Sequence, residues 1–113
     1  MTNEFGVRLD ANGYAPSIVQ IFEDRVCFNC EASGDLARHE IFNGYNRKKS
    51  KAYGLWVNLC PRCHMQIHDH SDRSLKVAGQ IRCMAEYGWT VEEFRERFGK
   101  SYVEVWEHED ERL

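Results

Sequence analysis

The sequence predicts a small α+β domain in which four cysteines tie two short strands to the helices that follow. Two Cys-x-x-Cys pairs enclose two segments rich in β-branched and aromatic residues, and helical periodicity returns only after the second pair. The chain has 113 residues and no internal repeat or low-complexity segment. We therefore expect one domain over 1–113, with its core at about 26–70 and helical support at 74–99.

The composition is that of a globular protein. Apolar residues make up 42% of the chain and aromatic residues 12%, and no apolar run approaches the ~20 residues that span a membrane. The first residues lack the basic-then-apolar pattern of an export signal. These features predict a cytoplasmic protein with no membrane partner, whose paired cysteines stay reduced and bind metal.

The strands are expected on either side of a charged segment. Residues 36–42 and 55–59 have strand-forming composition, and residues 43–54 are expected to form a polar loop between them. In the first 26 residues, the alternation of Val7 and Leu9 and the Asn12-Gly13 turn predict a short hairpin or an extended arm.

Two C-terminal helices are expected after the metal-binding segment. The first covers about 74–87, and the second begins at Thr90, which forms a capping box with Glu93, and ends at Gly99. The apolar positions predict the buried face of the first of these helices, which consists of Val77, Ala78, Ile81, Met84 and Ala85.

The four paired cysteines predict a structural zinc site. Zinc prefers four thiolates in a tetrahedron, at ~2.3 Å, and each Cys-x-x-Cys turn presents two of them. Cys27 and Cys30 form the first pair, and Cys60 and Cys63 form the second, 29 residues further on. Disulfides, free thiols or an iron–sulfur cluster are the alternatives. Cys83 stands alone and is expected to be a small buried side chain.

Three histidines form a second candidate metal site. Pro61 suits the first turn of a helix, and on that helix His64 and His68 are four residues apart and share a face. With His39 from the preceding strand they would supply three ligands and leave positions open for water and phosphate. A solvated helix face is the alternative interpretation of the pair.

The order of these motifs resembles the HNH endonucleases, and more narrowly their small phage-encoded branch with a four-cysteine zinc site. The resemblance covers about residues 26–70 and includes His39-Glu40-Ile41-Phe42, Asn46-Arg47-Lys48-Lys49-Ser50 and Tyr53-Gly54-Leu55-Trp56-Val57. Residues 64–68 also resemble the last helix of the colicin DNases. The resemblance implies a ββα-metal (His-Me finger) core, one catalytic cation (Mg²⁺, Mn²⁺, Ni²⁺ or Zn²⁺) and hydrolysis of DNA phosphodiester bonds.

The resemblance also implies roles for individual residues. His39 would bind the catalytic cation with His64 and His68, and Glu40 would occupy the position of the general base, which is usually a histidine. A second register makes His39 the base and leaves the cation to His64, His68 and a carboxylate. A third outcome is that Glu40 leaves the site weak or inactive. Asn46, beside Arg47, is expected to position the loop and to face the phosphate; Asn58 is the other asparagine near this position and is otherwise an exposed strand residue.

The basic run predicts contact with the DNA backbone. Arg47, Lys48, Lys49 and Lys51 would bind phosphates without reading sequence, although the chain has a net charge of −3 and a solvated charge run is the alternative. One site cuts one strand, so we expect nicking by a monomer, and double-strand cutting would require a homodimer or two sequential nicks. The alternative functions are an inactive zinc module that binds DNA or a phage or replication protein, and a ribonuclease of the same fold.

Overall fold

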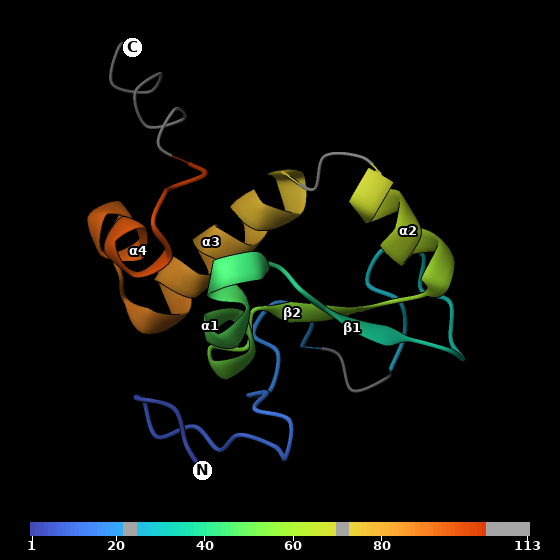
Figure 1. Ribbon diagram of the computed structural model, residues 1–113, viewed down its shortest axis with the longest axis horizontal. Helices are drawn as coiled ribbons and strands as arrows, with labels where there is room; N and C mark the ends of the chain where they lie inside the picture. Colours follow the sequence, from blue (N-terminus) through green and yellow to red (C-terminus); the bar gives the residue numbers. More distant parts are fainter. Residues whose placement is uncertain (22–24, 70–72, 104–113) are drawn as a thin grey trace.

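Two short antiparallel strands lie between helix α2 and the N-terminal segment (Figure 1). The computed structural model describes residues 1–21, 25–69 and 73–103, without the side chains of 68 and 69. In this part of the chain the elements are β1 (Ala37–Glu40), a 3₁₀ turn η1 (Gly44–Asn46), α1 (Arg47–Ala52), β2 (Trp56–Leu59), α2 (Pro61–Asp69), α3 (Arg73–Tyr87) and α4 (Val91–Phe98). The predicted α+β class is confirmed. No helix among the described residues is long and apolar enough to cross a membrane.

The register of the two strands gives the sheet two different faces. His39 pairs with Val57 and Glu40 pairs with Trp56 across the ladder. Because side chains alternate along a strand, His39 and Val57 share one face, and Arg38, Glu40 and Trp56 share the other. Val57 is fully buried and His39 is 3% exposed, so the histidine face is the one that packs into the core.

The N-terminal segment, or arm, folds back on itself at its start without forming regular strands. A single antiparallel bridge joins Thr2 to Arg8, and no regular strand forms in the described part of the segment. The predicted Asn12-Gly13 turn is confirmed: the amide of Gly13 donates to the carbonyl of Asp10 at 3.0 Å, and the amide of Asp10 donates to the carbonyl of Tyr14 at 2.9 Å.

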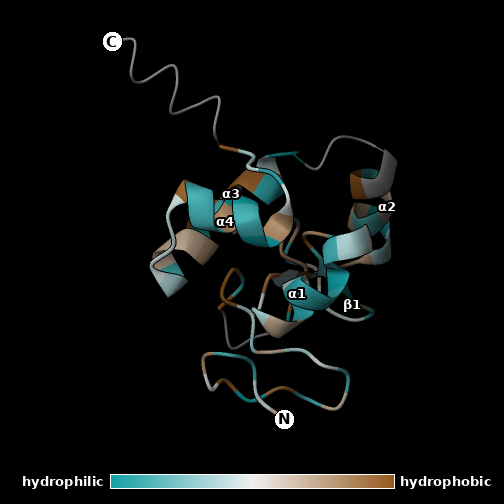
Figure 2. Ribbon diagram, turned by 60° about the vertical axis from the view of Figure 1, so that its left-hand side comes forward, coloured by the Kyte–Doolittle hydropathy of each residue, from teal (hydrophilic) through white to brown (hydrophobic). Residues whose placement is uncertain are grey.

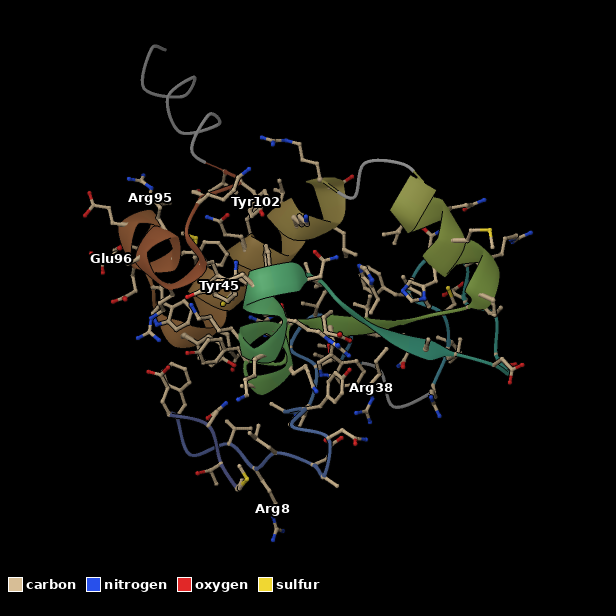
Figure 3. All side chains as sticks on the ribbon, in the orientation of Figure 1. Arg8, Arg38, Tyr45, Arg95, Glu96 and Tyr102 are labelled. Atoms are coloured by element: carbon tan, nitrogen blue, oxygen red, sulfur yellow. The ribbon has the colours of Figure 1, made fainter. Side chains whose placement is uncertain are left out.

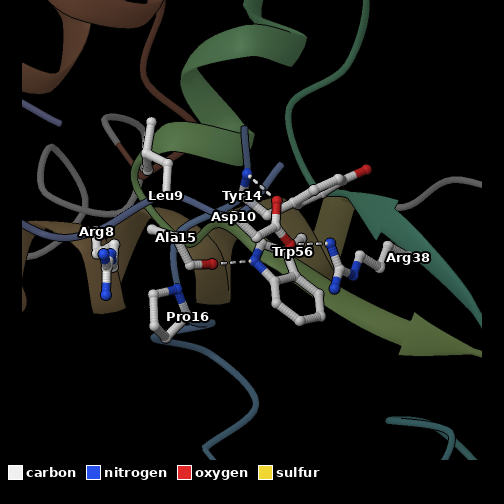
Figure 4. Close-up of a pocket in the computed structure, with 8 residues that line it drawn as sticks. All are labelled: Arg8, Leu9, Asp10, Tyr14, Ala15, Pro16, Arg38 and Trp56. Atoms are coloured by element: carbon white, nitrogen blue, oxygen red, sulfur yellow. Dashed lines mark hydrogen bonds and ion pairs between the residues drawn. The ribbon is translucent and has the colours of Figure 1, made fainter. Parts of the chain in front are cut away.

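Beyond this turn the arm runs alongside β2 (Figure 4). The indole Nε1 of Trp56 donates to the carbonyl of Ala15 at 2.7 Å, and the hydroxyl of Ser17 donates to the carbonyl of Trp56 at 2.6 Å. The amide of Asn58 donates to Oε1 of Gln20 at 2.7 Å. The arm thus satisfies backbone groups at the outer edge of a sheet that has only two strands.

The prediction of a polar loop at 43–54 is wrong, because the structure places η1 and helix α1 there. The segment is hydrophilic along most of its length (Figure 2), but arginine, lysine and alanine are strong helix formers, and the sequence interpretation gave more weight to charge than to propensity. The fully buried hydroxyl of Ser50 holds the helix against the end of β1: it donates to the carbonyl of Phe42 at 2.6 Å and accepts from the amide of the same residue at 3.0 Å.

Helix α3 begins one residue before its predicted start, but it buries a different face from the one predicted. Its buried residues are Gly79, Gln80 and Cys83, whereas Ile81, placed in the core by the sequence, is 55% exposed. The reason is a close approach: a Cβ at Gly79 would lie 3.1 Å from the side chain of Ile41, so this glycine lets the helix pack directly on the residue that follows β1. The prediction that Cys83 is buried is confirmed.

Helix α4 has the ends that the sequence predicts. The hydroxyl of Thr90 accepts a hydrogen bond from the amide of Glu93 at 3.1 Å, and the helix ends at Gly99 in the left-handed conformation. The carboxylate of Glu93 pairs with Nε of Arg97 at 3.0 Å. After the helix, buried Gln80 accepts from the amide of Tyr102 at 2.7 Å and so fixes the chain against α3.

Candidate metal centre

Four cysteine sulfurs from two distant turns gather at one end of the sheet. All lie within 4.8 Å of one another, and the Sγ atoms of Cys30 and Cys60 are 3.7 Å apart. A tetrahedral site with metal–sulfur bonds of ~2.3 Å places its sulfurs about 3.8 Å apart. All five cysteines of the chain are free, so the disulfide alternative is not found. The cluster has the size that could hold a metal ion such as zinc.

Backbone amides donate hydrogen bonds to two of the cysteine sulfurs and so stabilise their thiolate forms. Burial alone would raise the pKa of the Cys27 thiol, but the amides of Cys60, Cys30 and Asn29 donate to its sulfur and lower that pKa to about 6. In the second turn the amide of Cys63 does the same for Cys60, whose pKa is also lowered. Each Cys-x-x-Cys turn therefore directs its last amide at its first sulfur.

The pKa of Cys63, whose sulfur is the fourth of the cluster, shows why a cation would stabilise the four thiolates. The side-chain amide of Asn29 donates to Sγ of Cys63 at 3.4 Å and lowers the pKa of this thiol, but burial and the neighbouring thiols outweigh it and raise the pKa to about 11. Thiolates this close repel one another, so all four ionise together only when a cation offsets their charge. Asn29 is a site residue that the sequence interpretation missed, because only its position inside the first turn marked it.

Helix α2 starts on the second cysteine pair. Pro61 is its first residue, as predicted, and the amide of His64 donates to the carbonyl of Cys60 at 2.9 Å. Cys63 and His64 therefore belong to the same first helical turn, so any ion held by the cysteines also fixes the position of His64 relative to β1.

Two of the three predicted histidine ligands come together. The ring of His39 on β1 and the ring of His64 on α2 have centroids 5.2 Å apart, inclined at 73°. His68 lies in α2, but its side chain is outside the described residues. His39 is 3% exposed and faces the helix rather than solvent. The sheet and α2 thus bring together two imidazoles that are 25 positions apart in the sequence.

Glu40 lies on the opposite face of β1 from His39. Its carboxylate accepts hydrogen bonds from Nε of Arg47 at 2.6 Å and from the hydroxyl of Tyr14 at 2.8 Å, and its side chain is only 10% exposed. Burial and Glu40 together raise the pKa of Tyr14, so this hydroxyl remains a donor. Tyr14 was not predicted to belong to the site, since nothing in the sequence of the arm links it to β1.

Asn46 joins η1 to the end of α4. Its amide nitrogen donates to the carbonyl of Phe98 at 2.8 Å, and its amide oxygen is buried without a hydrogen-bond partner among the described residues. The residue thus anchors the start of α1.

The four cations of the basic run have different neighbours around α1. Arg47 is exposed and reaches Glu40, whereas Nζ of Lys49 donates to the carbonyl of Arg97 and lies 5.8 Å from the ring centroid of Phe98. Lys48, Lys49 and Lys51 all line one hollow beside Met1 at the N-terminus.

Comparison with known proteins gives no relative for this chain: no family model, no curated protein and no solved structure matches it.

Proposed function

We propose that this protein is a metal-dependent endonuclease of the HNH type, which hydrolyses phosphodiester bonds of DNA and nicks one strand at a time. The observation that carries the proposal is the approach of His39 and His64 to within 5.2 Å, measured between ring centroids, next to a cluster of four cysteines. Two antiparallel strands followed by a helix are also the elements that a ββα-metal core requires.

The two metal sites would have separate tasks. The four cysteines hold a structural Zn²⁺, which joins the first turn to the start of α2 and replaces core that so small a domain lacks. The histidines serve a second, catalytic cation. Between ring centroids His39 lies 5.2 Å from His64, so it lies beside any cation that His64 binds.

A cation bound there would supply positive charge that stabilises the charge developing on the phosphate and the leaving oxygen. From α2 its ligands would be His64 and His68, which are four positions apart in the sequence. Of the two registers that the sequence leaves open, we favour the one in which an imidazole nitrogen of His39 takes the proton of the attacking water. Glu40 lies across the strand from His64 and is already bound by Arg47 and Tyr14, which makes it the poorer candidate.

Cleavage of supercoiled plasmid tests the proposal. Zinc-loaded protein should convert it to the nicked circle when Mg²⁺, Mn²⁺ or Ni²⁺ is added, and chelation of the added cation should stop the reaction. His39→Ala should lower the rate by about 10²–10⁴-fold, the range for loss of a general base. Gln66→Ala, an exposed position on the same helix as His64, is the matched control and should cut like the wild type. The proposal would be refuted if the folded, zinc-loaded protein failed to nick the plasmid with every cation tested.

A cation titration separates the two roles of His39. With His39 as the base, His39→Ala should bind Ni²⁺ or Co²⁺ within about threefold of the wild type while cleavage is lost. A loss of affinity of about 100-fold or more would instead identify His39 as a ligand, which is the first register. His64→Ala removes a cation ligand on α2, so it should weaken cation binding whether His39 is the base or a ligand.

A second candidate function is a zinc module that binds DNA, or a phage or replication protein, without cutting. The observation in its favour is that Glu40 occupies the position where the HNH family usually has a histidine base, and that its carboxylate is engaged by two partners. One tightly bound zinc per chain, no second cation and no cleavage of DNA would support this function. Cleavage of RNA but not DNA would support a ribonuclease.

A further inference from the structure

A groove lined by cations lies on the face of β1 that carries Glu40. Its volume is about 450 Å³, and its lining consists of Asn12 and Tyr14 of the arm, Arg25, Arg38 of β1, and Arg47 and Lys51 of α1. No carboxylate belongs to this lining. Four cations from three separate segments therefore share one groove in a chain whose net charge is −3.

Aromatic rings hold two of these cations in place. The guanidinium of Arg38 lies over the ring of Tyr14, 4.4 Å from its centroid, and 4.9 Å from that of Trp56, and Nζ of Lys51 lies 4.8 Å from the Tyr14 ring. Figure 4 shows Arg38 reaching across Trp56 to Asp10, with which it forms an ion pair at 2.8 Å. Cations that are already ordered lose little conformational entropy when they bind an anion.

Among the described residues, the groove keeps a surplus of positive charge after its acidic neighbours are counted. Asp10 pairs with Arg38 and Glu40 pairs with Arg47, which leaves four cations against two carboxylates. Arg47 gives only its Nε to Glu40, one of the five N–H donors of a guanidinium, and its side chain is 63% exposed. The buried carboxylate of Glu40 thus orients Arg47 without neutralising the groove.

The groove and the histidine pair lie on opposite sides of the sheet. Arg38 and His39 are adjacent on β1, so their side chains point to opposite faces. Figure 3 shows Arg38 on the side of the strand away from α2, whereas His39 packs against His64 of that helix. A ligand in the groove therefore contacts residues other than the predicted catalytic ones.

We propose that this groove binds the sugar–phosphate backbone of double-stranded DNA, as a contact separate from the histidine pair. The inference rests on the proposed function, because it names the surface that holds the substrate. Three of the four cations are arginines, whose planar fork fits phosphate oxygens in pairs. Apart from Tyr14 the lining has no apolar side chain to insert into a membrane. Two residues of the basic run, Arg47 and Lys51, line the groove, together with Arg25 and Arg38.

The test is equilibrium binding of a fluorescein-labelled 20-base-pair duplex, measured by anisotropy at several NaCl concentrations. Every protein carries His39→Ala and no divalent cation is added, so cutting does not interfere. The groove variant is Arg25→Gln/Lys51→Gln, because neither side chain has an ion pair in the described structure. The matched control is Arg82→Gln/Lys100→Gln, which removes the same charge outside the groove.

The groove variant should bind about tenfold more weakly near 100 mM salt, and the slope of log K against log[salt] should fall by about 2, close to 0.9 for each phosphate that the variant no longer neutralises. The control should keep the affinity and slope of its parent. Equal slopes for the groove variant and the control would overturn the inference. The absence of duplex binding at 50 mM salt would also overturn it. Poly-aspartate that competes as strongly as unlabelled duplex of equal charge would overturn it as well.

Failure of this inference is distinguishable from failure of the proposed function. If plasmid is nicked but the groove variant binds duplex like the control, the nuclease stands and the groove is excluded. If the groove variant shows the expected loss but no cation supports nicking, the groove stands and the zinc module that binds DNA replaces the nuclease.

Discussion

The carboxylate of Glu40 accepts a hydrogen bond from Nε of Arg47 at 2.6 Å, on the side of β1 that faces away from the histidine pair. Tyr14 donates to the second oxygen of the same carboxylate at 2.8 Å, so Glu40 connects β1, α1 and the N-terminal arm. Glu40, for which the sequence resemblance proposes the role of catalytic base, thus has the contacts of a residue that positions the guanidinium of Arg47.

Glu40→Gln should separate these two roles. The amide keeps a hydrogen-bond acceptor for Tyr14 but loses the charge that holds Arg47, so we expect weaker DNA binding and a single-turnover rate at saturating DNA within about fivefold of the wild type. A general base at this position would instead cost about 10²–10⁴-fold in that rate. Glu86→Gln, which breaks the exposed pair with Arg82, is the control and should change neither quantity.

The cysteine cluster predicts that folding requires zinc. We expect one zinc per chain, and loss of helix α2 and of the cooperative unfolding transition when a strong chelator removes it, because about 10–16 kcal/mol of metal binding is typically coupled to folding in such sites. Cys60→Ser should have the same effect, and Cys83→Ala should keep the zinc content unchanged. Metal analysis and circular dichroism measure both. A metal-free protein with an unchanged thermal transition would contradict the prediction.

Gly54 is expected to be the glycine least tolerant of a side chain. Its φ is +75°, and a Cβ there would collide with the carbonyl oxygen of Pro16, which is backbone that cannot move aside cheaply. Gly54→Ala should lower the free energy of unfolding by about 3 kcal/mol or more. Gly44 also has a positive φ, +62°, but open space around it, so Gly44→Ala should cost only about 1 kcal/mol. Equal losses in urea denaturation would show that the contact with Pro16 contributes nothing.

Tyr53 should make the protein less stable in alkali. Burial, together with the hydrogen bond to Glu4, raises the pKa of its hydroxyl from 10.0 to about 12. Between these pH values the unfolded chain releases a proton that the folded protein keeps, so the free energy of unfolding falls as pH rises. Tyr53→Phe should flatten the fall in melting temperature between pH 10 and 12. Tyr45→Phe, at a side chain that is 94% exposed, should leave the wild-type slope unchanged.

Local chemistry determined which parts of this fold could be predicted from the sequence. The cysteine spacing, the proline that opens α2 and the cap at Thr90 act over a few residues, so each predicted its element correctly. Two predictions failed, for different reasons. The segment at 43–54 is helical because propensity outweighed its charge, and Ile81 is exposed because Gly79 lets a different face of α3 meet Ile41.

The sequence by itself predicted a cluster of four thiols that could hold a metal ion, and a histidine on the strand and on the helix that follows, since those residues and their spacing are visible along the chain. Only the tertiary structure decided which side of β1 each neighbour faces. His39 meets His64 across the core, while Arg38 and Glu40 turn toward the arm, Arg47 and Lys51. The reason is that partners many positions apart are chosen by how the arm and helices pack on the two faces of the sheet, and no local pattern encodes that choice.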